Sequence, residues 1–158
     1  MRHRIFIAIN LPEEIKEELF NYQNRFEDEG GWARWTKKDN LHITLEFLGY
    51  VDDKDMAKVL EKTQNFALKT TAFSVKLDKI DYFPNTEEPK YIFATGDGYH
   101  VTLARIKEWQ WRRIDPEERP VAEEDISLEF QVSSIEVMES VLKRSGSEYT
   151  ILRSYKLL

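Results

Sequence analysis

The chain has 158 residues, of which 41% are hydrophobic and 33% charged, and its formal net charge is −6. These values predict one soluble domain spanning residues 1–158, and the lack of cysteine excludes disulfides, thiolate nucleophiles and cysteine-based zinc sites. The acidic balance argues against tracking along a duplex and favours a small nucleotide or a strand end as ligand.

The first third of the chain predicts strand, helix and strand in turn. Residues 4–9 form a nearly continuous apolar run rich in β-formers, which predicts a central strand. Pro12 and apolar residues at helical spacing predict a helix over about residues 12–26 with its apolar face in the core. A short strand at 33–36 and a turn at 38–40 precede a strand over about 41–51.

The middle of the chain predicts a second helix and two more strands. Asp52 or Asp53 can cap the helix, whose expected buried stripe is Met56, Val59, Leu60, Thr63 and Phe66 or Ala67. Strands are expected over residues 71–80 and 90–95, with a loop over 82–89 between them.

The remainder predicts mostly strand. Residues up to about 107 continue a strand, and the polar, proline-containing stretch 108–125 predicts a loop. Strand character returns over 126–138 and 149–158, with a turn at 144–147. The order of elements indicates the α+β class with mixed or antiparallel sheets.

Two of the three histidines lie in a repeated His-x-Thr-Leu pattern, which begins at His42 and again at His100. Residues two apart on a strand share a face, so His42 lies beside Thr44, and His100 beside Thr102. The opposite faces are expected to be buried through Ile43, Leu45, Val101 and Leu103. Two imidazoles can divide phosphoryl transfer between a base and an acid, and threonine hydroxyls can hold phosphate oxygens.

A single copy of this pattern is weak evidence, because a lone histidine in a strand is more often structural. Two copies that use two of three histidines favour a catalytic pair. The third, His3, lies at the N-terminus between two arginines and is expected at the surface.

Beyond the repeat, the sequence resembles the 2H phosphoesterase superfamily along nearly its whole length. Within it, the chain is most similar to the RNA 2′,3′-cyclic phosphodiesterases, historically called 2′-5′ RNA ligases. The resemblance is carried by residues 4–9, 11–14, Arg34-Trp35, 40–45, 47–49 and 100–105. It implies a bilobal fold in which each lobe supplies one motif strand to a central cleft, and it implies no metal or other cofactor.

The resemblance also implies roles for the motif residues. His42 corresponds to the proton donor to the leaving 3′-oxygen, and His100 to the base that activates water. Thr44 and Thr102 correspond to residues that hold the non-bridging oxygens. In-line displacement places the entering and leaving oxygens on opposite sides of phosphorus, which suits two opposed imidazoles.

Two further features each allow two interpretations. Arg105 follows the second motif as in the family, but strict alternation puts it opposite His100 unless a bulge re-aims it, and a structural role is the alternative. Trp109 and Trp111, with Arg112 and Arg113, form either a stacking surface for a nucleobase or a polar loop with partly buried indoles.

The sequence departs from the family between the 90–95 strand and the second motif. A helix usually connects them, whereas only Gly96 to Tyr99 remain here, and Asp97-Gly98 is itself a hairpin signal. Three explanations are open: a lost helix that leaves a hairpin, residues absent from the sequence at this point, or an engineered or divergent chain with a damaged cleft. We favour an omitted or deleted segment that leaves the motif strands in place.

The predicted function is metal-independent hydrolysis of an RNA or nucleoside 2′,3′-cyclic phosphate to a 2′-phosphomonoester. Two alternatives are a non-catalytic module that binds an RNA end or a nucleotide, and reversible 2′-5′ ligation. We expect a cytoplasmic monomer that has no membrane partner and acts on RNA ends or small cyclic nucleotides.

Overall fold

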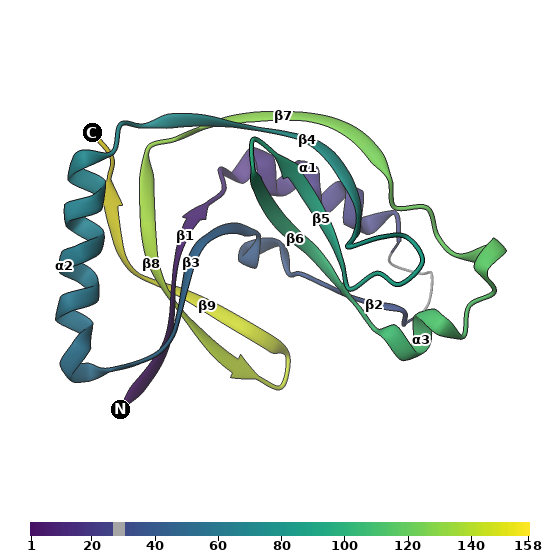
Figure 1. Cartoon of the computed structure of the whole chain (residues 1–158), viewed down its shortest axis with the longest axis horizontal. Helices are drawn as coiled ribbons and strands as arrows, with labels where there is room; N and C mark the ends of the chain where they lie inside the picture. The colour runs from purple at the N-terminus through teal and green to yellow at the C-terminus, as the bar shows by residue number, and fades with distance from the viewer. Residues whose placement is uncertain (27–30) are drawn as a thin grey trace. The chain divides into compact units, whose positions relative to one another are not determined.

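The chain divides into two compact units, each built from segments that are distant in the sequence (Figure 1). The computed structural model describes residues 1–26 and 31–158. Unit one contains residues 1–10, 42–74 and 131–158, and unit two contains residues 11–41 and 75–130. Both units combine an antiparallel sheet with helices, which confirms the predicted α+β class.

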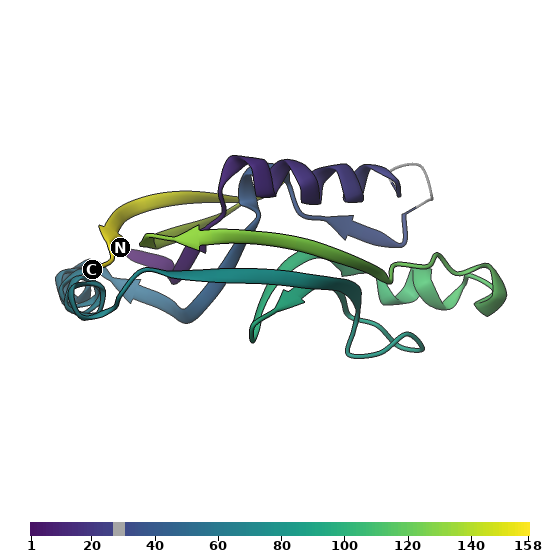
Figure 2. The same cartoon turned by 90° about the horizontal axis from the view of Figure 1, so that it is seen from above.

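Unit one has a four-stranded antiparallel sheet in the order β3-β1-β8-β9. Its strands are β1 (Arg2–Asn10), β3 (His42–Asp52), β8 (Ser134–Lys143) and β9 (Gly146–Lys156). Strand β1 is interior and buries five consecutive residues, Ile5 to Ile9, which confirms the predicted central strand. Figure 2 shows helix α2 (Asp53–Lys69) end-on beside these strands.

Helix α2 agrees only partly with its predicted buried stripe. Thr63 and Ala67 are buried, and Met56, Val59 and Leu60 are half-buried, whereas Phe66 is 56% exposed. Asp52 occupies the N-cap position without a capping hydrogen bond from its side chain. No helix in residues 1–26 or 31–158 is long and apolar enough to cross a membrane.

Unit two is built on a five-stranded sheet in the order β2-β6-β5-β4-β7. Its strands are β2 (Ala33–Trp35), β4 (Phe73–Phe83), β5 (Tyr91–Gly96), β6 (Tyr99–Ile106) and β7 (Glu124–Val132). Its helices are α1 (Glu13–Asn24), α3 (Glu108–Arg112) and the short 3₁₀ turns η1 (Lys38–Asn40) and η2 (Pro116–Glu118). Helix α1 lies over β2 in Figure 2.

The stretch 108–125 is not the continuous loop predicted, because it contains α3 and η2. Trp111 on α3 is 2% exposed and packs with Trp32 and Tyr82, at ring separations of 5.7 and 5.0 Å. Trp111 is therefore a core residue and offers no stacking surface to a ligand. Trp109, two residues earlier on α3, is 68% exposed.

The strand predicted over residues 126–138 is two strands in different sheets. Strand β7 ends at Val132 and β8 begins at Ser134. The carbonyl of Ser133, between them, accepts a hydrogen bond of 2.8 Å from the Leu157 amide. The loop predicted from Tyr82 also begins later, because β4 continues to Phe83.

Strands β5 and β6 form a hairpin at the shortened connection. Gly96 pairs with Tyr99, and the two turn residues, Asp97 and Gly98, have φ angles of 52° and 83°. Positive φ at both central positions is characteristic of the tight turn that suits a twisted hairpin. The Asp97 carboxylate accepts a hydrogen bond of 2.8 Å from the Lys76 amide, which fixes the turn to β4. The hairpin prediction is confirmed, in agreement with a second lobe that lacks the connecting helix.

Candidate active site

The first motif lies at the start of β3 in unit one. His42 pairs with Asn10 and Thr44 with Ala8 across the ladder, so both motif side chains share one face of the sheet. Nε2 of His42 and Oγ1 of Thr44 are 2.8 Å apart and hydrogen-bonded. The prediction that this imidazole and hydroxyl lie together is confirmed.

Two aromatic rings flank the half-buried His42 ring. The Phe6 ring is tilted against it at 5.1 Å, and the Tyr149 ring meets it edge-on at 5.2 Å. Burial raises the pKa of the Tyr149 phenol, and the nearby Arg4 partly offsets that rise. Phe6 and Tyr149 also contact each other at 5.1 Å, so the three rings form one cluster, and Thr44 bonds to Nε2 of His42.

The second motif lies on β6 in unit two and has a different environment. His100 pairs with Thr95 and Thr102 with Phe93, which puts both motif side chains on one face of that sheet. His100 is exposed, and its ring stacks on Phe93 at 4.3 Å and 27°. Desolvation lowers the pKa of His100 below its ordinary value of 6.5. A neutral imidazole, able to accept a proton, is therefore favoured at neutral pH.

Both motifs end in a β-bulge at the same relative position. Leu45 has no partner between Thr44 and Glu46 in the β1–β3 ladder, and Leu103 has none between Thr102 and Ala104 in the β5–β6 ladder. A bulge places two residues opposite one and shifts the later side chains to the other face. Leu103 is fully buried, but Leu45 is 37% exposed, so the predicted burial of Leu45 is wrong.

The second bulge determines where Arg105 points. Residues Tyr91, Phe93 and Thr95 alternate regularly on β5, and their partners on β6 are Arg105, Thr102 and His100. All these side chains share one face, so the bulge places the exposed Arg105 on the face of His100. Arg34 on β2 is paired with Arg105 and adds a second guanidinium to this row.

A buried glutamine supports this bulge. Nε2 of Gln23 donates hydrogen bonds to the carbonyls of Leu103 and Thr36, at 2.8 and 3.0 Å. The Thr36 hydroxyl donates to the carbonyl of Thr102 at 2.9 Å, and its amide donates to that of Leu103 at 2.9 Å. Helix α1 and the segment after β2 thereby hold the β6 backbone where its pairing with β5 is irregular.

His3 is placed away from the motif residues and is less exposed than predicted. Its side chain is 21% exposed and bonds to Asp53 at 2.5 Å and to Glu139 at 2.6 Å. These two carboxylates raise the pKa of His3. Through these two bonds, His3 connects the start of β1 to α2 and to β8.

Three rings that contact the histidines could not be assigned to them from the sequence, namely Phe6, Tyr149 and Phe93. All three rings lie in segments with strand character, but only the strand register assigns each ring to a histidine. In the described residues, no group of three or more histidine, aspartate or glutamate side chains is arranged to hold a metal ion.

Comparison with known proteins shows which family this chain belongs to. The sequence profile of the LigT-like phosphoesterases matches residues 9–93, which is more than half of the chain. The chain belongs to this family. The resemblance inferred from the paired motifs is thereby confirmed.

Relatives of similar length match this LigT-like chain nearly end to end. A Methanocaldococcus jannaschii protein named RNA 2′,3′-cyclic phosphodiesterase is 27% identical, with 96% of this chain and 99% of the relative covered. A Thermus thermophilus protein of the same name is 27% identical, with 98% and 90% covered.

Solved structures confirm the fold. The crystal structure of Thermus thermophilus TT0787 superposes with a TM-score of 0.84 at 24% identity, covering 98% of this chain and 97% of that one. Escherichia coli LigT complexed with 3′-AMP gives a TM-score of 0.77 at 19% identity, covering 99% of each chain. At these identities the likeness concerns the fold alone.

Proposed function

We propose that this LigT-like phosphoesterase hydrolyses the 2′,3′-cyclic phosphate of an RNA end or nucleoside to a 2′-phosphomonoester without a metal ion. His100 is the base and His42 the acid. Thr44, Thr102 and Arg105 bind the non-bridging phosphate oxygens.

The reaction consists of one in-line displacement at phosphorus. His100 removes a proton from water as the water oxygen bonds to phosphorus, and the bond from phosphorus to the 3′-oxygen breaks. His42 gives its proton to the departing 3′-oxygen. Hydroxyl and guanidinium donors stabilise the negative charge on the phosphate throughout.

The observation that carries this proposal is the matched pair of motif strands. Each motif strand presents an imidazole and a hydroxyl on one face and has a bulge directly after the threonine. The lowered pKa of His100 favours the neutral form that a base requires. The names of the relatives from Methanocaldococcus jannaschii and Thermus thermophilus agree with this chemistry.

The test is hydrolysis of adenosine 2′,3′-cyclic phosphate with and without EDTA, with the products resolved by ³¹P NMR. We expect turnover that EDTA leaves unchanged and a product phosphorylated only at the 2′-oxygen. Absence of turnover, or its loss on chelation, contradicts the proposal.

The shortened β5–β6 connection supports a second candidate, a module that binds an RNA end without chemistry. Tight binding of a 2′-phosphorylated RNA end, with the cyclic phosphate left intact, favours this module. Joining of RNA fragments through a 2′-5′ bond indicates that the same site also works in reverse.

A further inference from the structure

Strand β3 contains a second bulge, which changes the side chains that lie on the face of His42. Leu48 has no partner between Phe47 and Gly49 in the β1–β3 ladder. Phe47 pairs with Phe6 and Tyr50 with Arg4, and these partners lie on the β1 face that also bears Ala8, opposite Thr44. The two bulges together bring Phe47 and Tyr50 to the face of His42.

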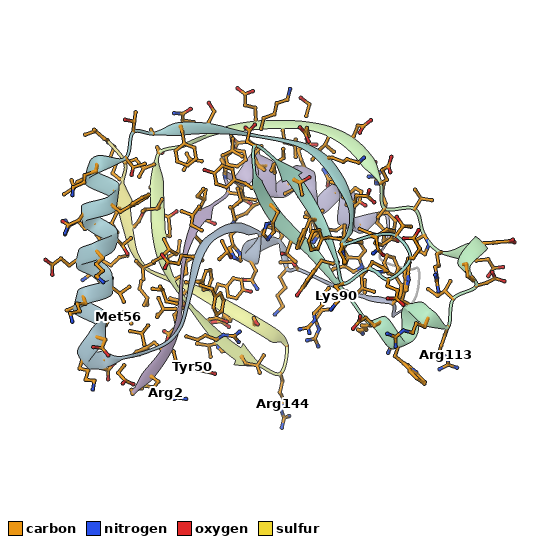
Figure 3. The ribbon with its side chains drawn as sticks, viewed as in Figure 1. Arg2, Tyr50, Met56, Lys90, Arg113 and Arg144 are labelled. Atoms are coloured by element: carbon orange, nitrogen blue, oxygen red, sulfur yellow. The ribbon has the colours of Figure 1, made fainter. Side chains whose placement is uncertain are left out.

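Each of these aromatic rings is covered by an arginine. The guanidinium of Arg4 lies 5.1 Å from the centre of the Phe47 ring, and that of Arg2 lies 4.6 Å from the centre of the Tyr50 ring. Phe47 and Tyr50 are nevertheless 55% and 63% exposed. Figure 3 shows Arg2 and Tyr50 close together, where β1 begins and β3 ends.

The row is continuous with the first motif. The Phe47 ring is stacked on Phe6 at 6.1 Å and 6°, and Phe6 contacts His42. We call Phe6, Phe47, Tyr50, Arg2 and Arg4 the aromatic–arginine row.

The charge of this row differs from that of the whole chain, whose formal net charge is −6. Among the residues that the structure describes, neither Arg2 nor Arg4 forms an ion pair within 4 Å. Asp52 is the ladder partner of Arg2 and weakens the positive charge at that end. Arg4 is therefore the stronger candidate for a phosphate contact.

We infer that the aromatic–arginine row binds the two nucleotides that precede the cyclic phosphate in a single-stranded RNA substrate. This inference rests on the proposed function, because it assigns the path of the chain that leads to His42. Aromatic faces accept any base by stacking, and arginines between them pair with the phosphates. Because Leu48 is bulged out, Phe47 and Tyr50 face Phe6 and Arg4, which are two residues apart on β1, or about 7 Å of strand, and this suits two adjacent nucleotides.

The experiment compares kcat/KM for a trinucleotide that ends in a 2′,3′-cyclic phosphate with kcat/KM for the cyclic mononucleotide. We expect the wild-type ratio to exceed one. Phe47→Ala should lower the ratio roughly five-fold or more, because stacking on one ring contributes about 1–3 kcal/mol per base. Arg4→Ala should also lower the ratio, because it removes the charged partner of a phosphate.

Matched controls come from elsewhere in unit one. Phe66→Ala removes an aromatic ring that is 56% exposed on α2. Arg153→Ala removes an exposed arginine from β9, where its partner Val137 aligns with Ile7 on the face opposite Phe6. Both controls should keep the wild-type ratio.

The outcomes separate this inference from the proposed function. Turnover of both substrates with a ratio that Phe47→Ala and Arg4→Ala leave unchanged overturns the inference alone. Absence of all turnover overturns the proposed function, and the inference is then tested by fluorescence anisotropy with a labelled trinucleotide that ends in a 2′-phosphate. There Arg4→Ala should reduce the slope of log K against log salt by about 0.7, and an unchanged slope and affinity would overturn the inference.

Discussion

The two motif strands differ most at the fifth residue after each histidine. Because a bulge follows each threonine, this residue returns to the histidine face: it is Phe47 after His42 and Arg105 after His100. Phe47 pairs across the ladder with Phe6, whereas Arg105 pairs with Tyr91. The same kind of bulge thus places an aromatic ring on the histidine face in unit one and a cation on the histidine face in unit two.

The two histidines also differ in their surroundings. His42 is half-buried against two rings and bonded to Thr44, whereas His100 is covered on one side by Phe93. Within the described part of the chain, the His100 imidazole forms no hydrogen bond. Identical motifs can therefore take different protonation roles because their neighbours, rather than their sequence, set the ring's surroundings.

Removing either imidazole is the strongest way to test whether the two motifs form a pair. His42→Ala and His100→Ala should each lower kcat/KM for the cyclic mononucleotide by about 10²- to 10⁴-fold. The double variant should be little slower than the slower single variant, because the two groups act as a unit. His3→Gln is the matched control and should retain turnover. Near-normal activity in either single variant would show that the motifs are independent.

The support of the second bulge can be removed through Gln23. Gln23→Leu deletes two buried hydrogen bonds to the carbonyls of Leu103 and Thr36, so we expect it to lower the free energy of unfolding by about 1–3 kcal/mol. Urea denaturation measures this change. The exposed Gln64→Leu serves as the control and should stay within about 0.5 kcal/mol of wild type. Equal stabilities of the two variants would contradict the assigned role of Gln23.

The pH profile tests the unequal environments of the histidines. His100 must be neutral to act as a base, and its lowered pKa places the acid limb of kcat/KM below pH 6.5. Phe93→Ala exposes the ring, so the acid limb should move upward toward 6.5. Phe83→Ala, which removes the ring that stacks on Phe93 at 5.0 Å, should leave the limb in place. A limb unchanged in Phe93→Ala would show that Phe93 does not cause the lowered pKa.

The smallest expected effect concerns unit one and His3. Bonding to Asp53 and Glu139 raises the pKa of His3 in the folded state. The stability from its protonated form is fully present below the unfolded pKa of about 6.5, and it is lost as pH rises through the higher folded pKa. Urea midpoints between pH 5.5 and 9 should show this loss in the wild type and a weaker loss in His3→Gln. Parallel pH curves for the two proteins would exclude the contribution.

Regular alternation explains how much of the site the sequence could predict. It correctly assigned the shared faces of the motif residues, since His42 and Thr44 precede their bulge and His100 and Thr102 precede theirs. It failed at Leu45, the first bulged residue, and left Arg105 open. A bulge depends on the pairing of two strands, and neither strand's own sequence marks it.

Short elements and strand boundaries were the other limits. Helix α3 spans only Glu108–Arg112, which is too short to show helical periodicity, and prolines follow it. Residues 126–138 look continuous because β-formers lie on both sides of Ser133, yet β7 and β8 join different sheets. Burial of Trp111 followed from packing with Trp32 and Tyr82, which are far away in the sequence.

The interleaved course of the chain has a consequence for its synthesis on the ribosome. Unit two is complete once residue 130 has emerged. The sheet of unit one also needs β8 and β9, so Phe6 can pair with Met138 only after β8 has emerged. Such distant pairing slows folding, because a long loop must close before the contact forms. The strand that bears His100 can therefore fold on the nascent chain, while the contact of Tyr149 with His42 forms only after β9 has emerged.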